Sequence, residues 1–303
     1  MTAPRGDVDP SRTVLRAAIV LASAGRPALL GEALRSCAGQ QGVDFQLVVS
    51  VPDEASLPAD PHTLEGVRVV SGTRGLAAQR NAALAVLNDV DVVAFFDDDA
   101  VLRPDYLAQA LRFFERHPEI VGLTGRVLLD GAVSGEVPRD VADDALSASA
   151  AEAPAGRWRS ARELYGCNFV VRVDRAPDLR FDSRLPLYSW LEDHDFARRL
   201  MRVGPLAKVE DCVIVHRAAA SGGRQSHTRL GYSQVMNPVY LNRKGSFPLW
   251  LAVDQIYLRV AKNLALSVAG PSSTWRRERL RGNMMAAGDA LRGRITPERI
   301  TEL

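Results

Sequence analysis

The sequence predicts an α/β protein: a mainly parallel, Rossmann-like sheet flanked by helices, with a C-terminal helical appendage. Short apolar runs, typical of buried strands, alternate with stretches whose apolar residues recur at helical spacing. The chain has 303 residues, of which 47% are hydrophobic and 24% are charged, so it is long enough for a large core. Its formal net charge of +2 is too small to indicate a nucleic acid as partner.

The first hundred or so residues supply strands and helices in alternation. Ala17 to Ala22 is wholly apolar, and Pro27 follows at a position that suits the first turn of a helix. The expected strands here span 17–22, 45–51, 67–71 and 92–96, and the expected helices span 28–40, 75–87 and 104–117. This order favours parallel strands with crossover helices.

The pattern is less regular beyond residue 120. A strand is expected over 121–129, and strand-like runs follow at 166–171 and 212–216, with a helix over 193–201 between them. The segment 130–159 is rich in Ala, Ser, Gly, Pro and Asp, and it is interpreted as a loop or lid.

The composition also suggests how the chain is divided. Residues 1–13 are polar and lack the apolar core of a signal peptide, so we expect a flexible leader. Residues 14–230 show no linker and are interpreted as one domain, followed by a helical region over 231–303. The apolar run 247–269 is interrupted by charges, which predicts an amphipathic helix and no membrane span.

That amphipathic helix has several expected uses. It suits a membrane interface, because aromatic and apolar residues are flanked by cations. It equally suits packing on the rest of the chain or a homodimer contact. The cysteines Cys37, Cys167 and Cys212 lie far apart with no CxxC spacing, which indicates neither a zinc site nor a disulfide framework. We therefore expect a reduced, cytoplasmic setting. The amphipathic helix suggests an alternative, in which the protein lies peripherally on the inner face of the membrane.

The run Asp97-Asp98-Asp99 ends an apolar strand and is the most informative stretch of the sequence. Adjacent carboxylates repel one another, so a hard divalent cation is expected to lie between them. In open α/β sheets, ligands also collect at the carboxyl ends of strands. The alternative is a solvated acidic turn or the start of the helix that follows Pro104.

A second acidic cluster, Glu192-Asp193-His194-Asp195, opens a helix after Trp190. Carboxylates at this place can simply cap the helix and complement its dipole. Yet the run holds more ionisable residues than a cap requires, and an aromatic neighbour suits a carboxylate tuned for base catalysis.

Together these motifs resemble glycosyltransferase family 2, whose members use nucleotide sugars and have the GT-A fold. The acidic run Asp97-Asp98-Asp99 is similar to the Asp-x-Asp motif, and Glu192-Asp193 to the Glu-Asp motif of that family. Gly75 with Arg80-Asn81, Gly166-x-Asn168 and His216 match further motifs in the same order. The resemblance covers about residues 15–230.

The resemblance implies an inverting transfer of a sugar with Mg²⁺ or Mn²⁺ as cofactor. Asp99, Asp97 and His216 would form the metal site, and Asp193 would be the general base with Glu192 in support. Donor contacts are implied for Ala22, Ser23, Arg26, Asp53, Gly75, Arg80, Asn81, Asp97 and Asp98. Acceptor contacts are implied for Gly166, Asn168 and Trp190.

Two stretches of the donor region need separate mention. Family members commonly carry Asp-Asp-Gly-Ser after the second strand, whereas this chain has Ser50 and then Asp53, either of which could contact the nucleobase. The run 221–225, with its glycines and Arg224, suits a lid over the diphosphate.

The expected partners are a nucleoside diphosphate sugar and a glycan or lipid-linked acceptor in cell-surface or exopolysaccharide assembly. Two alternatives remain open. A nucleotidyltransferase shares the sheet and the aspartates, but it normally has a longer glycine-rich loop after the first strand than Gly25-Arg26-Pro27. The other alternative is a non-catalytic carbohydrate-binding or scaffold protein with a degenerate site.

Overall fold

The computed structural model describes residues 14–72, 74–152, 155–219, 226–268 and 273–303. The expected leader 1–13 and the lid segment 221–225 lie outside these residues. The strands are β1 (Ala17–Ala22), β2 (Phe45–Val51), β3 (Val67–Ser71), β4 (Val92–Asp97), β5 (Ala100–Leu102), β6 (Gly122–Asp130), β7 (Trp158–Ala161), β8 (Asn168–Arg172) and β9 (Leu206–His216). Their positions confirm the α/β class.

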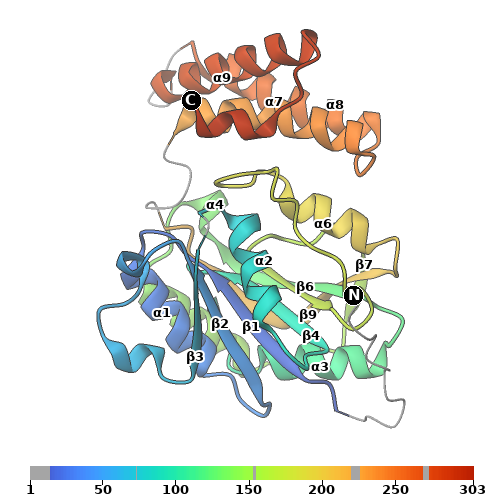
Figure 1. Cartoon of the computed structure of the whole chain (residues 1–303). Helices are drawn as coiled ribbons and strands as arrows, with labels where there is room; N and C mark the ends of the chain where they lie inside the picture. The colour runs from blue at the N-terminus through green and yellow to red at the C-terminus, as the bar shows by residue number, and fades with distance from the viewer. Residues whose placement is uncertain (1–13, 73, 153–154, 220–225, 269–272) are drawn as a thin grey trace.

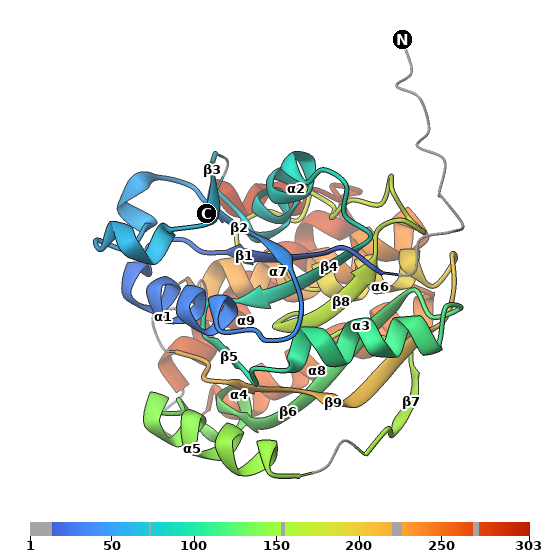
Figure 2. The same cartoon turned by 90° about the horizontal axis from the view of Figure 1, so that it is seen from below.

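One sheet holds all of these strands in the order β3-β2-β1-β4-β8-β6-β9-β5, with β7 paired to β9 (Figure 2). The strands β3, β2, β1 and β4 are parallel, as expected. Beyond β4 the sheet is mixed, because β8 runs antiparallel to both β4 and β6. The register places Ala22 beside Ser50 and Asp97, so these residues share one edge of the sheet.

Helices cover both faces of the sheet. They are α1 (Pro27–Ala38), α2 (Leu76–Val86), α3 (Tyr106–Arg116), α4 (Gly131–Ser134), α5 (Arg139–Ala150) and α6 (Glu192–Leu200). Apolar residues of α1 and α3 pack on one face of β1 and β4, and those of α2 and α6 pack on the other face. This packing fixes the positions of the strand ends and of the start of α6 relative to one another.

The expectation of a loop over 130–159 is wrong. The segment forms α4, α5 and the start of β7. Ala142 and Leu146 of α5 pack on Val213 and Val215 of β9, and alanine is a strong helix former. The prediction relied on composition and therefore missed α5, which has only a few buried apolar residues.

The C-terminal helices are α7 (His227–Lys244), α8 (Leu249–Leu266) and α9 (Ser273–Leu291), followed by a short 3-10 helix at Pro297–Thr301. They lie together as a layer above the sheet and its flanking helices (Figure 1). Two glycines let α7 and α9 cross closely, since a Cβ on Gly231 or Gly282 would lie 2.1 Å from a carbonyl oxygen of the other helix. Within the described residues, none of the helices has the length and apolar character that crossing a bilayer requires.

Candidate active site

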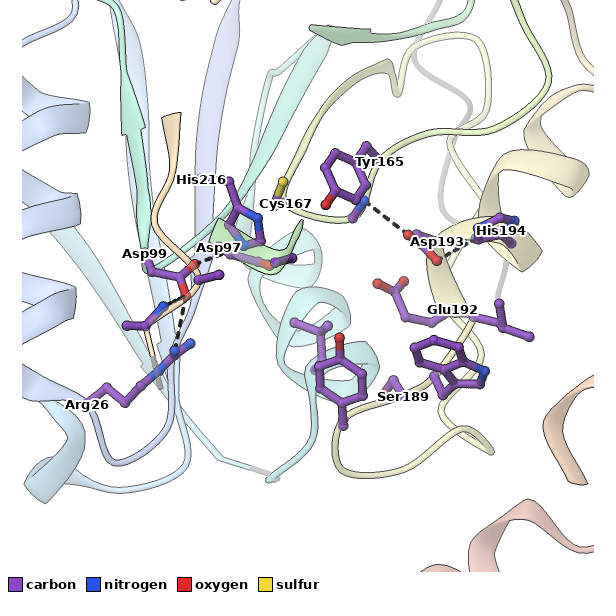
Figure 3. A pocket seen from close by; sticks show the side chains of 18 of the residues that line it. Arg26, Asp97, Asp99, Tyr165, Cys167, Ser189, Glu192, Asp193, His194 and His216 are labelled. Atoms are coloured by element: carbon purple, nitrogen blue, oxygen red, sulfur yellow. Dashed lines mark hydrogen bonds and ion pairs between the residues drawn. The ribbon is translucent and has the colours of Figure 1, made fainter. Parts of the chain in front are cut away.

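A cavity of about 670 Å³ opens between the edge of the sheet and the start of α6 (Figure 3). At one side it is lined by Asp97, Asp99 and His216, which we call the sheet-edge group. At the other side it is lined by Glu192 and Asp193, which we call the helix-start group. Residues from distant parts of the sequence therefore face one another across a single cavity.

The sheet-edge group has the donor atoms of a cation site. One ligand atom from each of its residues lies within 4.8 Å of the others. The Oδ1 atom of Asp99 is buried without a hydrogen-bond partner among the described residues, which is costly unless a cation satisfies it. Carboxylate oxygens with one imidazole nitrogen suit Mn²⁺ or Mg²⁺. The residues present thus fit a divalent cation.

His216 is held in place by a carboxylate that sequence reasoning missed. Its Nδ1 atom lies 2.8 Å from Oδ1 of Asp130, and the other oxygen of Asp130 accepts from the hydroxyl of Tyr165 at 2.7 Å. Burial opposes ionisation of Asp130, but these hydrogen bonds outweigh it and lower the pKa of the carboxyl. An ionised Asp130 requires the proton on Nδ1, which leaves the Nε2 lone pair of His216 for the site.

Asp98 turns away from the cavity that its neighbours line. It accepts hydrogen bonds from Ser23 and from the guanidinium of Arg26. Burial raises the pKa of Asp98 to about 7, although the charge of Arg26 opposes that shift. Its observed contacts fix the loop after β1, and through that loop they set the position of Arg26, which lines the cavity.

The helix-start group is positioned by backbone amides. Asp193 accepts from the amide of Gly166 at 3.0 Å and from that of His194 at 2.8 Å. A Cβ on Gly166 would lie 2.9 Å from Oδ2 of Asp193, so the glycine is needed for this approach. Glu192 is buried, and its Oε2 atom has no partner among the described residues. Burial raises the pKa of Glu192 to about 8 against the opposing charge of Arg80.

The loop before α6 is strained. Leu187, Ser189 and Leu191 have φ values of 57°, 54° and 70°, which non-glycine residues rarely adopt. Contacts from other elements hold it: the amide of Leu76 donates to Leu187 O at 2.9 Å, and Asn237 of α7 donates to Trp190 O at 2.8 Å. The loop places Tyr188 and Trp190 on the cavity wall.

Arg80 joins the two groups. Its guanidinium donates to Glu192, to Asp97 at 3.2 Å and to the carbonyl of Gly166 at 2.7 Å. The side chain is 1% exposed and lies over the rings of three phenylalanines, at 5.2–5.8 Å from their centroids. A fixed cation therefore sets the spacing between the carboxylates of both groups.

Several predicted site residues lie outside the cavity. Asn81 bonds the backbone of Phe181, and Asn168 accepts from the hydroxyl of Tyr106, so both side chains hold the scaffold. Ser50 is buried, and its carbonyl accepts from Gln79. Asp53 bonds Ser56 and lies 3.2 Å from Arg74. Their suggested roles in binding stay predictions.

A second cavity of about 430 Å³ adjoins the first on the side of β1. Ala22, Ser23, Arg26 and Gly75 line it, and the donor contacts suggested for them stay predictions. The opposite wall comes from the C-terminal helices and was not foreseen. Its residues are Ser226, Arg229, Leu230, Ser233 and Ile300.

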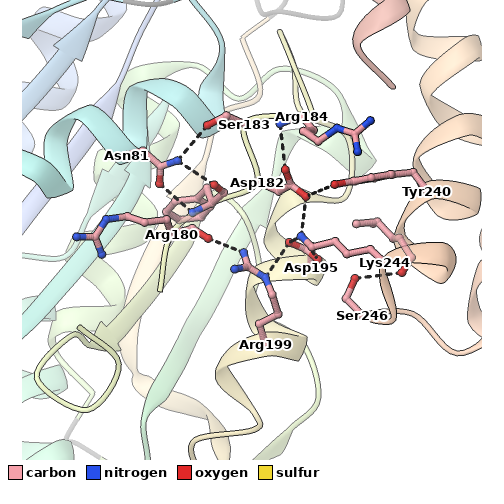
Figure 4. Close-up of polar contacts among 12 residues, drawn as sticks. Asn81, Arg180, Asp182, Ser183, Arg184, Asp195, Arg199, Tyr240, Lys244 and Ser246 are labelled. Carbon is pink, nitrogen blue, oxygen red and sulfur yellow. Dashed lines mark hydrogen bonds and ion pairs between the residues drawn. The ribbon is translucent and has the colours of Figure 1, made fainter. Parts of the chain in front are cut away.

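An ionic network ties the C-terminal helices to α6 (Figure 4). Lys244 of α7 donates to both oxygens of Asp195, at 3.0 and 2.8 Å, and to Asp182 at 2.6 Å. Asp195 is fully buried and also accepts from Arg199 at 3.0 Å. The appendage expected from sequence is thus an integral part of the site.

The sequence carried one signal for Asp130, the partner of His216 that the motifs did not indicate. Asp130 ends a strand, as Asp97 does.

Comparison with known proteins finds one matching family model. Residues 18–139 match the model of glycosyl transferase family 2. The matched segment is less than half of the chain. It includes the acidic run and Arg80, whereas the helix-start group lies beyond it. No curated protein sequence matches the chain.

Solved structures of glycosyltransferases have a fold similar to that of this chain. A mannosyltransferase, PcManGT from Pyrobaculum calidifontis, in complex with GDP-Man and Mn²⁺, is 18% identical with a TM-score of 0.58, over 93% of this chain and 88% of the other. TarS from S. aureus is 15% identical with a TM-score of 0.50, over 95% of this chain and 53% of the other. The resemblance and the GT-A fold class expected from the motifs are confirmed.

Proposed function

We propose that the protein is a metal-dependent, inverting glycosyltransferase that moves a sugar from a nucleoside diphosphate to an acceptor hydroxyl. The observation that carries this proposal is the single cavity of about 670 Å³ that joins the sheet-edge group to Asp193. A donor held at one side can then be attacked from the other side, which is the geometry of a single displacement.

Asp97, Asp99 and His216 would hold Mg²⁺ or Mn²⁺. When bound, the cation would stabilise the negative charge that collects on the departing diphosphate. The Oδ1 atom of Asp99 supports this assignment, because it is buried without a hydrogen bond among the described residues. The Mn²⁺ named with the mannosyltransferase of similar fold supports it as well. Arg26, which donates to Asp99 at 3.4 Å, adds a further cation for the diphosphate.

Asp193 would act as the general base. It takes the proton of the acceptor hydroxyl while that oxygen bonds to the anomeric carbon and the bond from that carbon to the diphosphate breaks. The nucleoside diphosphate leaves, and the configuration at the anomeric carbon is inverted. The amides of Gly166 and His194 fix the carboxylate, and the unpartnered Oε2 of Glu192 provides a second contact for the acceptor.

The nucleoside would bind in the cavity of about 430 Å³ beside β1. Arg74 and Arg229 lie on its walls. Gly75, also on the wall, lets the backbone of Leu187 pack closely, since a Cβ there would lie 3.1 Å from Leu187 N. The donor sugar would then project past Asp97, which lines both cavities. The GDP-Man named with the mannosyltransferase makes a guanosine donor the first to test.

We place this activity in cell-surface or exopolysaccharide assembly, in the cytoplasm or at the inner face of the membrane. The outer side of α8 supports this placement, because Trp250, Val253, Tyr257 and Leu264 are 54–69% exposed at helical spacing. Sedimentation with vesicles of phosphatidylglycerol, compared with a Trp250→Ser, Tyr257→Ser variant, would test it.

The decisive experiment for the activity is Asp193→Asn. Thermal shifts with UDP, GDP and dTDP, with and without Mn²⁺, first identify the nucleotide. We expect the variant to lose at least about 10³-fold in transfer rate while its shift with nucleotide and Mn²⁺ is unchanged. Asp144→Asn, which changes an exposed carboxylate of α5 outside both cavities, is the control. Full transfer by Asp193→Asn, or a product with retained configuration by NMR, would contradict the proposal.

A further inference from the structure

The wall of the larger cavity beyond Asp193 has a cation and an aromatic surface that the proposed transfer does not use. Tyr188 and Trp190 stack with ring centroids 6.2 Å apart and an interplanar angle of 26°. Arg259 of α8 lies over the Trp190 ring, with its guanidinium carbon 5.3 Å from the centroid. All of these residues line the cavity, as does His227 of α7.

Among the described residues, the guanidinium of Arg259 forms no ion pair with a carboxylate, and it lies against the face of the Trp190 ring. Stacking satisfies the flat face of a guanidinium and leaves its N–H groups at the edge free to donate. The other arginine that lines this cavity, Arg26, is paired with Asp98 and Asp99.

His227 of α7 also lines this cavity. Arg279 donates from Nε to Nδ1 of His227 at 3.3 Å, and the imidazole stacks on Trp275 at 5.1 Å between centroids. Burial and the charge of Arg279 lower the pKa of His227, which favours the neutral ring. With Nδ1 accepting, the proton is on Nε2, so the ring can donate a hydrogen bond.

From this arrangement we infer that the acceptor carries an anionic group, a phosphoryl or a carboxylate, that is bound by Arg259 and His227 while its sugar ring packs on Tyr188 and Trp190. An aromatic platform suits the apolar face of a sugar, and a guanidinium edge suits a phosphate or carboxylate. The inference rests on the proposed function, because it specifies the acceptor of that reaction. It also gives a role to the C-terminal helices, because α7 supplies His227 and α8 supplies Arg259.

Binding of matched glycosides tests the inference. The protein is first saturated with Mn²⁺ and the nucleoside diphosphate found by thermal shift, so that the sheet-edge group is occupied. Phenyl glucoside, phenyl glucuronide and phenyl glucoside 6-phosphate are then titrated by calorimetry. We expect at least one anionic glycoside to bind about 10-fold or more tightly than the neutral one. The tighter of the two anions identifies the group as carboxylate or phosphoryl.

Arg259→Met should reduce the anionic glycoside to the affinity of the neutral one and leave nucleotide affinity unchanged. Lys262→Met, which removes an exposed charge from the same helix outside both cavities, is the matched control and should keep the preference. Equal affinity for all glycosides, or a preference that survives in Arg259→Met, overturns the inference. Failure of the proposed function would give a different result from failure of this inference. In that case no nucleotide would bind together with Mn²⁺, or the Asp193→Asn variant would keep full transfer activity.

Discussion

The sheet-edge group and the helix-start group face the same cavity but are positioned by different kinds of structure. Asp97 and His216 end strands of the sheet, and backbone pairing of β5 with β9 places Ala100 opposite His216. Glu192 and Asp193 instead follow a loop with strained φ values, and contacts from α2 and α7 hold that loop. One group depends on regular strand register, and the other depends on packing between elements distant in the sequence.

This difference predicts where each group is vulnerable. A sheet-edge residue can be altered without moving its backbone, so changes there should act on ligand binding alone. A helix-start residue can be displaced by a change in a neighbour that never touches a substrate. The predictions below test this contrast.

The largest effect is expected for Asp99→Asn. The amide removes the charge and one ligand oxygen while keeping the shape, so the Mn²⁺-dependent part of nucleotide affinity should be lost. We expect transfer to fall by at least about 10³-fold and the melting temperature without ligand to be nearly unchanged. Calorimetry with nucleotide and Mn²⁺ measures the binding. Asp140→Asn, on the exposed side of α5, is the control. If Mn²⁺-dependent nucleotide binding persists in Asp99→Asn, the sheet-edge group is not the cation site.

An intermediate effect is expected for Gly166→Ala. The added Cβ would meet Oδ2 of Asp193 and displace the carboxylate by a few tenths of an ångström or more. Misplaced catalytic groups typically cost about 10²-fold in rate, so kcat should fall by roughly 10–100-fold while nucleotide affinity is kept. Gly72→Ala, where a Cβ meets nothing within 4 Å, is the matched control. Steady-state kinetics measures kcat of both variants. Equal kcat values would show that catalysis does not require the close approach of Gly166 to Asp193.

The smallest effect concerns pH. Glu192 has its pKa raised to about 8 by burial, whereas in the unfolded chain it titrates near 4.5. Between these values the folded state keeps a proton that the unfolded chain releases, so stability is highest below pH 4.5 and declines as pH rises toward 8. We expect Glu192 to contribute a loss of roughly 1–2 kcal/mol in the free energy of unfolding from pH 5 to 6.5.

Urea unfolding at several pH values measures that loss. Glu192→Gln keeps an oxygen for Arg80 and cannot ionise, so its stability should vary less with pH over this range. A wild-type decline that is equally steep in the variant would assign the pH dependence to other groups.

Much of the sheet-edge group was visible in the sequence. The acidic run follows an apolar strand, and strand ends in a parallel sheet meet at one edge, so the location of Asp97 and Asp99 followed from periodicity. The same reasoning did not separate Asp98 from its neighbours. Asp98 lies in the turn after β4, where its carboxylate meets Ser23 and Arg26 of the loop after β1. Only the packing of that loop against the turn shows that Asp98 has a partner there.

The sequence by itself determined the α/β class, the four parallel strands at the start of the sheet, and the motifs of the family, because these depend on local apolar patterns and short spacings. Tertiary structure decided the rest. Arg80 joins carboxylates 95 residues apart in sequence, those of Asp97 and Glu192. Arg229 and Arg259 bring the C-terminal helices to the cavity walls. No local sequence pattern predicts such contacts, because they form only when the helices pack against the sheet. The order of the strands in that sheet does not follow from their order along the chain.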